Sequence, residues 1–480
     1  MSSQRGYDTA LALTRQVIVP SCPRRCLRSA STLLFVLSAS LSAQESAVVG
    51  GTLIDGTGRD PVPNAVVLVR GGRIACAGTR AECPVPSSAR RIDAARGWVM
   101  PGLIDAHVHF SQTGWFDGRP DAGDFRDRYP YARVIAALQA DPTRFFKAYR
   151  CAGVTSVFDV GGYPWTWELR RRYASDSLAP RIAAAGPLLA TVPHWLNLPD
   201  QQQLIHMTSD SLVREVVRSH AAFGSDAVKL WYIMPPEPPD TARMQELVRV
   251  AGDEARKQRL PLIVHATGLW EAKDAIRAGA RVLVHSVFEQ DVDDEFISLA
   301  RESRVIYVTT IMVAPGYLDA ARGREATWPY PLGCADSASR EFAAADLAGE
   351  PALAWARKPA AIERRAREDS IARRNVKRLS DAGVSIAVGT DAGNPGTFHG
   401  PSIYRELGIL QDAGLTPMQV LVAATRTAAD AMGRADSVGT LERGKYADLL
   451  VLDADPTADV RNVQRLRVVL KGGFAWHRSR

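Results

Sequence analysis

The feature that most constrains the fold is a regular alternation of short apolar runs with longer helical stretches between about residues 100 and 435. The apolar runs occupy residues 153–159, 227–231, 260–265, 282–285, 305–309 and 384–391. A strand that is apolar on both faces belongs in a parallel sheet that helices cover on both sides. The segment is long enough for eight strand–helix units and predicts an α/β fold, a (β/α)8 TIM barrel. An open doubly wound sheet is the alternative, but no Gly-rich phosphate loop follows the first strand.

The two ends of the chain have a different pattern, in which short β-strand segments alternate with turns. Because both ends share this pattern around a different middle, we expect a single small β-sandwich domain formed by both chain ends. Residues 322–357, which contain Trp328 and three prolines, interrupt the barrel pattern and are expected to form a lid or an inserted loop. The predicted organisation is a signal peptide at 1–43, an N-terminal β-sandwich segment at 44–99, the barrel at 100–435 and a C-terminal β-sandwich segment at 436–480.

The first 43 residues end in the pattern of a secretory signal. Arg24, Arg25 and Arg28 precede an apolar run at 31–41, and small residues follow it up to Ala43. The run is shorter than the roughly 20 apolar residues that a membrane-spanning helix needs. We therefore expect a periplasmic or secreted protein that keeps no stable membrane anchor after signal removal. A buried helix of the folded protein is the alternative.

Charge and cysteine usage fit an exported globular enzyme. Much of the formal net charge of +7 lies in the expected signal peptide, so nucleic acid is not an expected partner. Export permits disulfides, and Cys76 and Cys83 flank a short turn that could bring them into a local bridge. Cys151 and Cys334 are expected to be buried thiols. No Cys-x-x-Cys spacing occurs, which argues against a cysteine-ligated structural zinc.

Ionisable side chains stand at the ends of the apolar runs, where a barrel carries its catalytic groups. His107 and His109 are two positions apart, so on a strand they point the same way and can supply half of a metal site. His265 and His285 each end an apolar run. Asp391 ends the last run, where a carboxylate can bind a metal and accept a proton. Each could be a structural residue if it stood alone, with Asp391 as a helix N-cap, but together they indicate a metal centre.

Lys229 lies inside the apolar run 227–231. Burying a charged ammonium is costly, and an ammonium cannot bind a metal. A neutral amine could instead take up CO2 and become a carbamate, an anion able to bridge two metal ions. The alternative is a lysine whose stem is buried and whose amine reaches the surface.

These residues resemble, in order along the chain, the metal-centre motifs of the amidohydrolase superfamily: Pro101–His109, Lys229, His265, His285 and Gly389–Gly393. The closing stretch resembles the imidazolonepropionase-like and prolidase-like (Xaa-Pro dipeptidase-like) branch, through His399-Gly400, Ala424-Thr425 and residues 439–453. The resemblance covers about residues 47–475. It implies a (β/α)8 barrel with a small β-sandwich built from both ends.

The resemblance also implies a binuclear centre of two divalent metal ions, expected to be Zn²⁺. His107, His109 and Asp391 would hold the more buried ion. His265 and His285 would hold the second, with carboxylated Lys229 as the bridge. The resemblance further implies that a hydroxide bridging the ions attacks a carbonyl and that Asp391 is the catalytic residue relaying the proton to the leaving group.

Two departures bear on the substrate. The mononuclear deaminases of the superfamily typically lack the lysine and carry a glutamate where this chain has Gly268, so deamination is disfavoured. Prolidase-like members carry a glycine pair soon after the lysine strand, whereas residues 232–239 of this chain contain none. The substrate pocket therefore departs from that pattern, and the candidate substrate-binding residues are His194, Tyr232 and His399.

The sequence thus predicts an exported metal-dependent hydrolase that cleaves an amide or peptide bond in a small-molecule substrate, a dipeptide or an N-acyl amino acid. A cyclic amide, a lactone or a carbamate would suit the same centre. A non-catalytic binding protein is the alternative from another class, but loss of metal ligands is its expected mark and all six are present. Barrels of this type often form homo-oligomers, and a homo-oligomer is one assembly that this chain could form.

Overall fold

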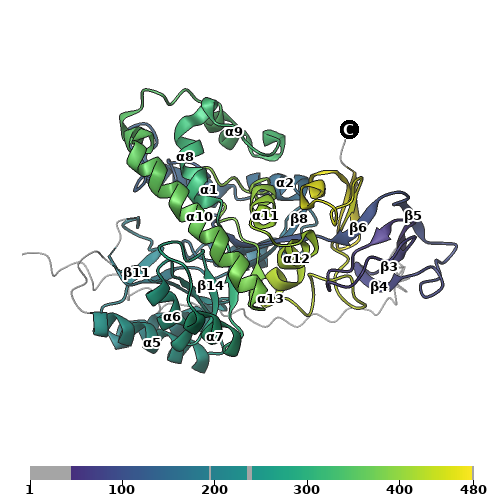
Figure 1. Ribbon diagram of the computed structural model, residues 1–480, viewed down its shortest axis with the longest axis horizontal. Helices are drawn as coiled ribbons and strands as arrows, with labels where there is room; N and C mark the ends of the chain where they lie inside the picture. The colour runs from purple at the N-terminus through teal and green to yellow at the C-terminus, as the bar shows by residue number, and fades with distance from the viewer. Residues whose placement is uncertain (1–44, 194–195, 235–240, 478–480) are drawn as a thin grey trace, which may run out of the picture. The chain divides into compact units, whose positions relative to one another are not determined.

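A computed structural model of the chain describes residues 45–193, 196–234 and 241–477 (Figure 1). The expected signal peptide and His194 lie outside the described residues. Among the described helices, none combines the length and apolar character that a bilayer span requires.

The two chain ends meet in one β-sandwich, as predicted. One sheet has the order β4-β3-β1-β5 and the other β19-β18-β17-β6-β2. Leu449 of β17 pairs antiparallel with Pro101 of β6, so the yellow C-terminal strands continue the purple N-terminal sheet in Figure 1. Residues of both sheets, such as Val67 and Val451, form a shared apolar core. The strands are β1 (Ser46–Val49), β2 (Thr52–Leu53), β3 (Val66–Arg70), β4 (Arg73–Gly78), β5 (Arg90–Asp93), β6 (Trp98–Pro101), β17 (Leu449–Leu452), β18 (Leu466–Lys471) and β19 (Phe474–His477).

The middle of the chain forms the predicted barrel of parallel strands. They are β7 (Leu103–Val108), β8 (Val154–Asp159), β9 (Arg181–Ala184), β10 (Leu188–Ala190), β12 (Val228–Trp231), β13 (Leu262–His265), β14 (Ala280–Val284), β15 (Ile306–Val308) and β16 (Ser385–Ala387). β9 and β10 follow each other closely, and they pair with β8 and β12 respectively. β11 (Leu204–His206) pairs with β10 on its other edge.

Backbone hydrogen bonds join the first barrel strand to the last. Ala106 N donates to Val388 O at 3.0 Å, and Asp391 N donates to His107 O at 2.8 Å. Gly389 permits this close approach, because a Cβ there would lie only 2.7 Å from Cβ of His107. The first and last barrel strands are therefore joined next to His107 and Asp391, two of the predicted metal ligands.

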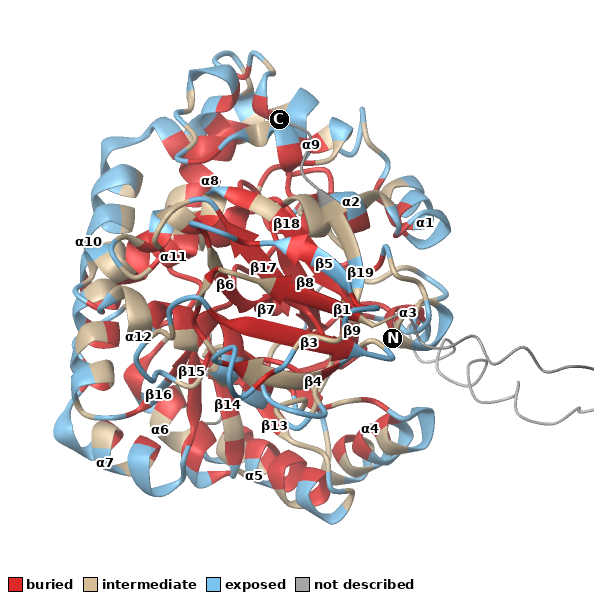
Figure 2. Cartoon of the chain, turned by 90° about the vertical axis from the view of Figure 1, so that its right-hand side faces the viewer, coloured by how far each residue is buried: buried red, intermediate tan, exposed pale blue. Residues whose placement is uncertain are grey.

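Helices cover the outside of the barrel. They are α1 (Tyr131–Ala140), α2 (Arg144–Cys151), α3 (Thr166–Arg172), α4 (Asp210–Phe223), α5 (Thr241–Lys257), α6 (Leu269–Arg277), α7 (Asp294–Glu302), α8 (Val313–Arg322), α10 (Pro359–Asp381), α11 (Ser402–Asp412), α12 (Pro417–Val422) and α13 (Ala428–Ala431). Figure 2 shows buried strands at the centre and exposed outer faces on helices such as α5 and α10. In α10, Ile371, Ala372, Val376 and Leu379 are buried at helical spacing, while several arginines stay exposed.

Residues 322–357 form an inserted segment of short helices. It contains the 3₁₀ helices Gly323–Glu325, Leu332–Cys334 and Pro351–Arg357 and the helix α9 (Ser337–Ala343). The Phe342 ring stacks on Trp115 with 4.2 Å between centroids, so the insertion packs on the loop after β7.

The four cysteines among the described residues form two disulfides. Cys76 and Cys83 are bridged, in agreement with the local pairing that the sequence allowed. The prediction of buried thiols at Cys151 and Cys334 is wrong, because these residues also form a disulfide. They lie 183 positions apart in the sequence, and only the docking of the inserted segment on α2 brings their Cα atoms within 5.4 Å.

Candidate metal centre

The structure brings all six predicted ligands to one cavity of 260 Å³ at the carboxyl ends of the barrel strands. The strands position them, because each residue lies within its strand or at most four residues beyond the strand's last residue. β7 carries His107 and is followed by His109, while β12 carries Lys229 and β13 ends at His265. His285 follows β14, and Asp391 follows β16.

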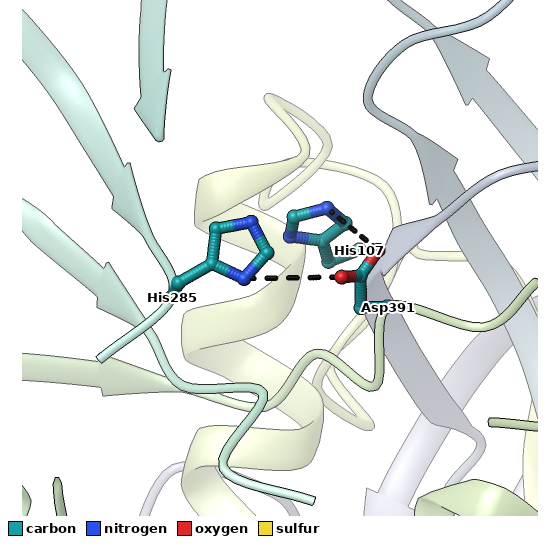
Figure 3. A group of neighbouring side chains, drawn as sticks. All are labelled: His107, His285 and Asp391. Atoms are coloured by element: carbon teal, nitrogen blue, oxygen red, sulfur yellow. Dashed lines mark ion pairs between the residues drawn. The ribbon is translucent and has the colours of Figure 1, made fainter. Parts of the chain in front are cut away.

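Three of the side chains converge closely around the Asp391 carboxylate. Its Oδ1 lies 3.3 Å from Nε2 of His107 and 3.0 Å from Nε2 of His109. Its Oδ2 faces Nδ1 of His285 at 3.9 Å, and Figure 3 shows His107, His285 and Asp391 pointing toward one another. Ligand atoms of His107, His285 and Asp391 lie within 4.8 Å of one another, close enough to hold one metal ion.

The donor chemistry of this cluster fits a cation. Nδ1 of His109 lies 2.6 Å from the carbonyl oxygen of Gly161, which can only accept, so Nδ1 carries the proton. Nε2 of His109 therefore presents a lone pair to the Asp391 carboxylate. Two electron-rich atoms at this separation repel each other unless a positive ion binds between them. Oδ1 of Asp391 has no hydrogen-bond donor among the described residues, which agrees with a role as a ligand.

The remaining ligands, His265 and Lys229, line the same cavity. The rings of His265 and His285 lie 4.3 Å apart between centroids, and those of His107 and His285 lie 4.7 Å apart. The Lys229 side chain is 2% exposed, and its Nζ has no hydrogen-bond partner within the described part of the chain. An unpartnered buried amine is costly, and its position in the cavity wall fits the bridging anion expected from carboxylation.

Burial sets the protonation of these groups in favour of metal binding. It lowers the pKa of His265 well below its usual value, and that of His285 to about 3, so both rings are neutral near pH 7. Burial also lowers the pKa of Lys229 to about 7.

The backbone around the centre is strained. His285, Thr310 and Asp391 have φ values of 70°, 74° and 58°, in the left-handed region that side-chain-bearing residues rarely adopt. Such strain persists only where neighbouring contacts hold it, and it concentrates at functional sites. Oγ1 of Thr310 lies 2.8 Å from Nδ1 of His285, so a contact between two strained residues fixes the orientation of the His285 ring.

Two buried carboxylates hold these loops, and neither was predicted from the sequence. Asp105 accepts from Thr390 N at 2.9 Å and from Thr390 Oγ1 at 2.6 Å, which fixes the residue before Asp391. Glu406 accepts from the backbone N–H groups of Ile311 and Met312 at 2.9 and 2.8 Å. An acid inside the apolar strand 103–108 was a signal for Asp105. Nothing in the sequence of α11 connects Glu406 to a loop about 95 positions earlier.

Comparison with known proteins decides the family. Residues 98–474 match the model of the amidohydrolase family, which is well over half of the chain. The chain belongs to the amidohydrolase family. Members of this family are generally metal-dependent, and the convergence of His107, His285 and Asp391 provides a possible metal site. This amidohydrolase is therefore a metal-dependent hydrolase that acts on carbon–nitrogen bonds.

Relatives of this amidohydrolase match it over most of their length. Ochratoxinase from Aspergillus niger is 25% identical over 516 residues, covering 98% of this chain and 95% of the relative. An imidazolonepropionase from Methylobacterium nodulans is 28% identical over 424 residues, covering 83% of this chain and 90% of the relative. The crystal structure of a Xaa-Pro dipeptidase with bound methionine superposes with a TM-score of 0.69 at 23% identity, covering 91% of this chain and all of the other, which shows the shared barrel fold.

The substrate-binding candidates Tyr232 and His399 lie outside the cavity lining of the amidohydrolase. Trp231, the last residue of β12, lines the cavity, and the next residue, just beyond the end of the strand, points the other way. The Tyr232 hydroxyl accordingly donates to Oδ2 of Asp274, at 2.9 Å. His399 packs against Phe145 in the aromatic core, with 3.7 Å between ring centroids.

Both ring nitrogens of His399 are occupied. Nε2 donates to the carbonyl oxygen of Gln112 at 3.0 Å, so Nδ1 accepts from the Tyr149 hydroxyl at 2.6 Å. Burial lowers the pKa of His399 to about 4 and keeps the ring neutral. Its role in the amidohydrolase is therefore to join α2 to the loop after β7.

The cavity walls contain residues that were not selected from the sequence. Arg119, in the loop after β7, donates to Asp121 at 2.9 and 2.7 Å and also to Oδ1 of Asn394. The Tyr317 hydroxyl donates to the same Asn394 oxygen at 2.8 Å. Apolar residues make up much of the remaining wall, among them Leu188, Leu196, Leu204, Trp231, Phe288 and Ile311. A small substrate would thus meet apolar surface together with charged side chains, among them Arg119, Arg365 and Asp369.

Proposed function

We propose that this protein is an exported binuclear amidohydrolase that hydrolyses the amide bond of a dipeptide or an N-acyl amino acid. The observation that carries the proposal is the convergence of five ligand-type side chains around an unpartnered buried lysine in one cavity. The names of the relatives support amide hydrolysis, and the dipeptidase neighbour supports the choice of a small amino-acid-derived substrate through its fold.

Each side chain has a role in this proposal. His107, His109 and Asp391 would hold one divalent ion, expected to be Zn²⁺, and His265 and His285 the second, with the carbamate of Lys229 between them. When bound, the ions supply an activated water near neutral pH and a polarised carbonyl. Asp391 directs Oδ1 toward the His107 and His109 rings and Oδ2 toward His285. As a carboxylate it can accept a proton from the attacking water and pass it to the leaving amine.

The cavity walls support a substrate with an apolar part and a carboxylate. A volume of 260 Å³ is at the small end of ligand sites, which suits a dipeptide or an acylated amino acid. Leu196, Trp231 and Phe288 present apolar surface. Arg119, held in place by Asp121 and Asn394, can bind a carboxylate with a charge-assisted hydrogen bond. A cyclic amide, a lactone or a carbamate remains the second candidate substrate class on the same centre.

The proposal of export rests on the signal pattern and on the disulfides. Disulfides persist in oxidising compartments such as the bacterial periplasm and are rare in the cytosol. The described residues contain two, one of which fastens the inserted segment to the barrel through Cys151 and Cys334. Cell fractionation with an antibody tests this element of the proposal, and recovery of the protein in the cytosolic fraction alone would contradict it.

Metal analysis of the purified protein tests the centre. We expect about two divalent ions per chain, and we expect Lys229→Ala to lose both metal and activity. Lys257→Ala is the matched control, because that side chain is exposed on the outside of α5. A metal-free active enzyme, or a fully active Lys229→Ala variant, would refute the binuclear centre.

A substrate panel tests the proposed bond. Dipeptides and N-acyl amino acids should be cleaved faster than lactones or carbamates of similar size. Arg119→Met should lower kcat/KM by about tenfold or more for an N-acyl amino acid, because a hydrogen bond to a charged group is lost. It should have little effect on the matching N-acyl amino acid amide, which lacks the carboxylate. Arg133→Met, at an exposed position of α1, serves as the control.

A further inference from the structure

A second cavity, of 300 Å³, lies at the opposite end of the barrel from the predicted ligands. Arg181 lines it and is the first residue of β9, whereas the metal centre is at the carboxyl ends of the strands. The cavity is bounded on one side by α3, which packs against β9, as Figure 2 shows. On the other side, Arg73 of β4 and Lys471 of β18 bring in the sandwich. The site therefore joins the two domains.

The lining of this cavity is strongly cationic. It includes five cationic side chains and, among the described residues, no acidic one: Arg73, Arg170, Arg181, Arg434 and Lys471. Tyr446 contributes an aromatic wall, with the guanidinium carbons of Arg181 and Arg73 at 3.5 and 4.2 Å from its ring centroid. Two guanidiniums that contact one ring lie close to each other, so their charges add locally.

Nearby acids balance only some of this charge. Asp226 pairs with Arg170 and Arg434, each at 2.6 Å. Asp448 pairs with Arg181 through contacts of 2.6 and 3.0 Å. Three arginines thus share two carboxylates behind the cavity wall.

The other two cations have weaker partners. Arg73 donates to the carbonyl oxygen of Gly444 at 2.7 Å, and Lys471 donates to that of Asp176 at 2.9 Å. Lys471 is 8% exposed. Burial, followed by the charge of Arg181, lowers its pKa to about 8, which still leaves it protonated at neutral pH. A buried ammonium without a carboxylate partner is expensive unless an anion offsets it.

We infer that this cavity binds a small organic anion that carries a phosphate or several carboxylates. Arginine forks and an ammonium are the groups that hold such anions in proteins. Leu169, Ile182 and Val438 line the floor and would accept the apolar portion of the molecule. Because the lining comes from both domains, the bound anion would link the sandwich to the barrel. This inference does not depend on the proposed amide substrate.

Titration calorimetry of the intact metal-loaded protein tests the inference. Inorganic phosphate and propane-1,2,3-tricarboxylate are the probes, in about 150 mM salt so that exposed charges are screened. We expect saturable binding of at least one probe and a rise of Tm with its concentration. Lys471→Met and Arg73→Met should each weaken that binding by roughly tenfold or more, since each removes a charged hydrogen-bond donor.

The control variants make the result decisive. Arg91→Met removes one positive charge from an exposed position of β5 outside the cavity and should leave binding unchanged. Arg73 is exposed, so Arg73→Met remains informative if Lys471→Met fails to fold. Saturation by phosphate but not by the tricarboxylate would assign a phosphate-bearing ligand, and the converse a polycarboxylate. Binding of neither probe, or binding that survives both cavity substitutions, would overturn the inference.

Discussion

Replacing Lys229 with methionine separates two consequences of burying this lysine. The proposed carbamate requires the amine, so the substitution removes the bridge between the ions. In the metal-free protein, the same amine is an isolated polar group in the barrel interior, with no hydrogen-bond partner among the described residues. Methionine has a similar length and no charge. We therefore expect Lys229→Met to be inactive, and in metal-free form to be more stable than the wild type.

The magnitude follows from the pKa of Lys229. Folding lowers it from 10.5 to about 7, and each pKa unit corresponds to about 1.4 kcal/mol of unfolding free energy. Because the folded chain gives up this proton at a lower pH than the unfolded chain, the full cost of about 5 kcal/mol is present below pH 7. It shrinks as pH rises from 7 to 10.5 and is absent above that range. The difference in stability between metal-free Lys229→Met and wild type should therefore narrow by about 1.4 kcal/mol per pH unit above pH 7.

Urea unfolding of the chelator-treated proteins at pH 7, 8 and 9 measures the difference in stability between Lys229→Met and wild type. The kcat/KM of the metal-loaded proteins measures the loss of activity. We expect activity to fall by more than about 100-fold, since even changes behind a metal ligand commonly cost 10–100-fold. Lys257→Met, on the exposed face of α5, should show neither effect. The prediction is refuted if metal-free Lys229→Met is no more stable than wild type at pH 7, or if it keeps wild-type activity.

Three further contacts lead to predictions of their own. Replacing Cys151 and Cys334 together by serine should lower the unfolding free energy by about 5 kcal/mol, because their bridge closes a loop of 183 positions. Replacing Cys76 and Cys83, whose bridge spans seven positions, should lower it by about 2 kcal/mol. Equal losses for the two variants in urea unfolding would contradict this prediction. Glu406→Gln should weaken metal binding about 10–100-fold, with activity restored by added zinc; unchanged metal affinity by chelator competition would argue against a positioning role. Tyr232→Phe should change kcat/KM by no more than about twofold. It should lower the unfolding free energy by about 1 kcal/mol, because the lost hydroxyl donates to Asp274. A tenfold loss of kcat/KM would instead place Tyr232 in the substrate site.

The sequence was most informative where one strand alone determines the outcome. His265 ends an apolar run, and in a parallel barrel the end of each run must face the same mouth. The same logic placed Asp391 at the cavity without knowledge of any contact, whereas Lys229 was selected because its charge would be costly to bury inside an apolar run. The sandwich was also predictable, because strands that lack a partner at one chain end need strands from the other.

Features that depend on contacts distant in sequence were not predictable. Cys151 and Cys334 meet only because the inserted segment docks on α2. Tyr232 and His399 were selected by residue type and proximity to motifs, but strand alternation and aromatic packing direct them away from the cavity. Arg119 was missed because its loop has no periodic pattern, and only the packed structure shows that Asp121 holds it at the cavity wall.

The seam between β7 and β16 has a consequence for biogenesis. Asp105 is bonded to Thr390 across 285 positions of sequence, immediately beside ligands from both strands. Nearly the whole barrel must therefore leave the ribosome before the first and last strands can meet. Metal can then bind fully only after the first and last strands have joined. In a chain in which β7 and β16 are still apart, His107 and His109 lie at one strand and Asp391 lies at the other. Uptake of zinc by refolding protein should accordingly lag behind the appearance of secondary structure.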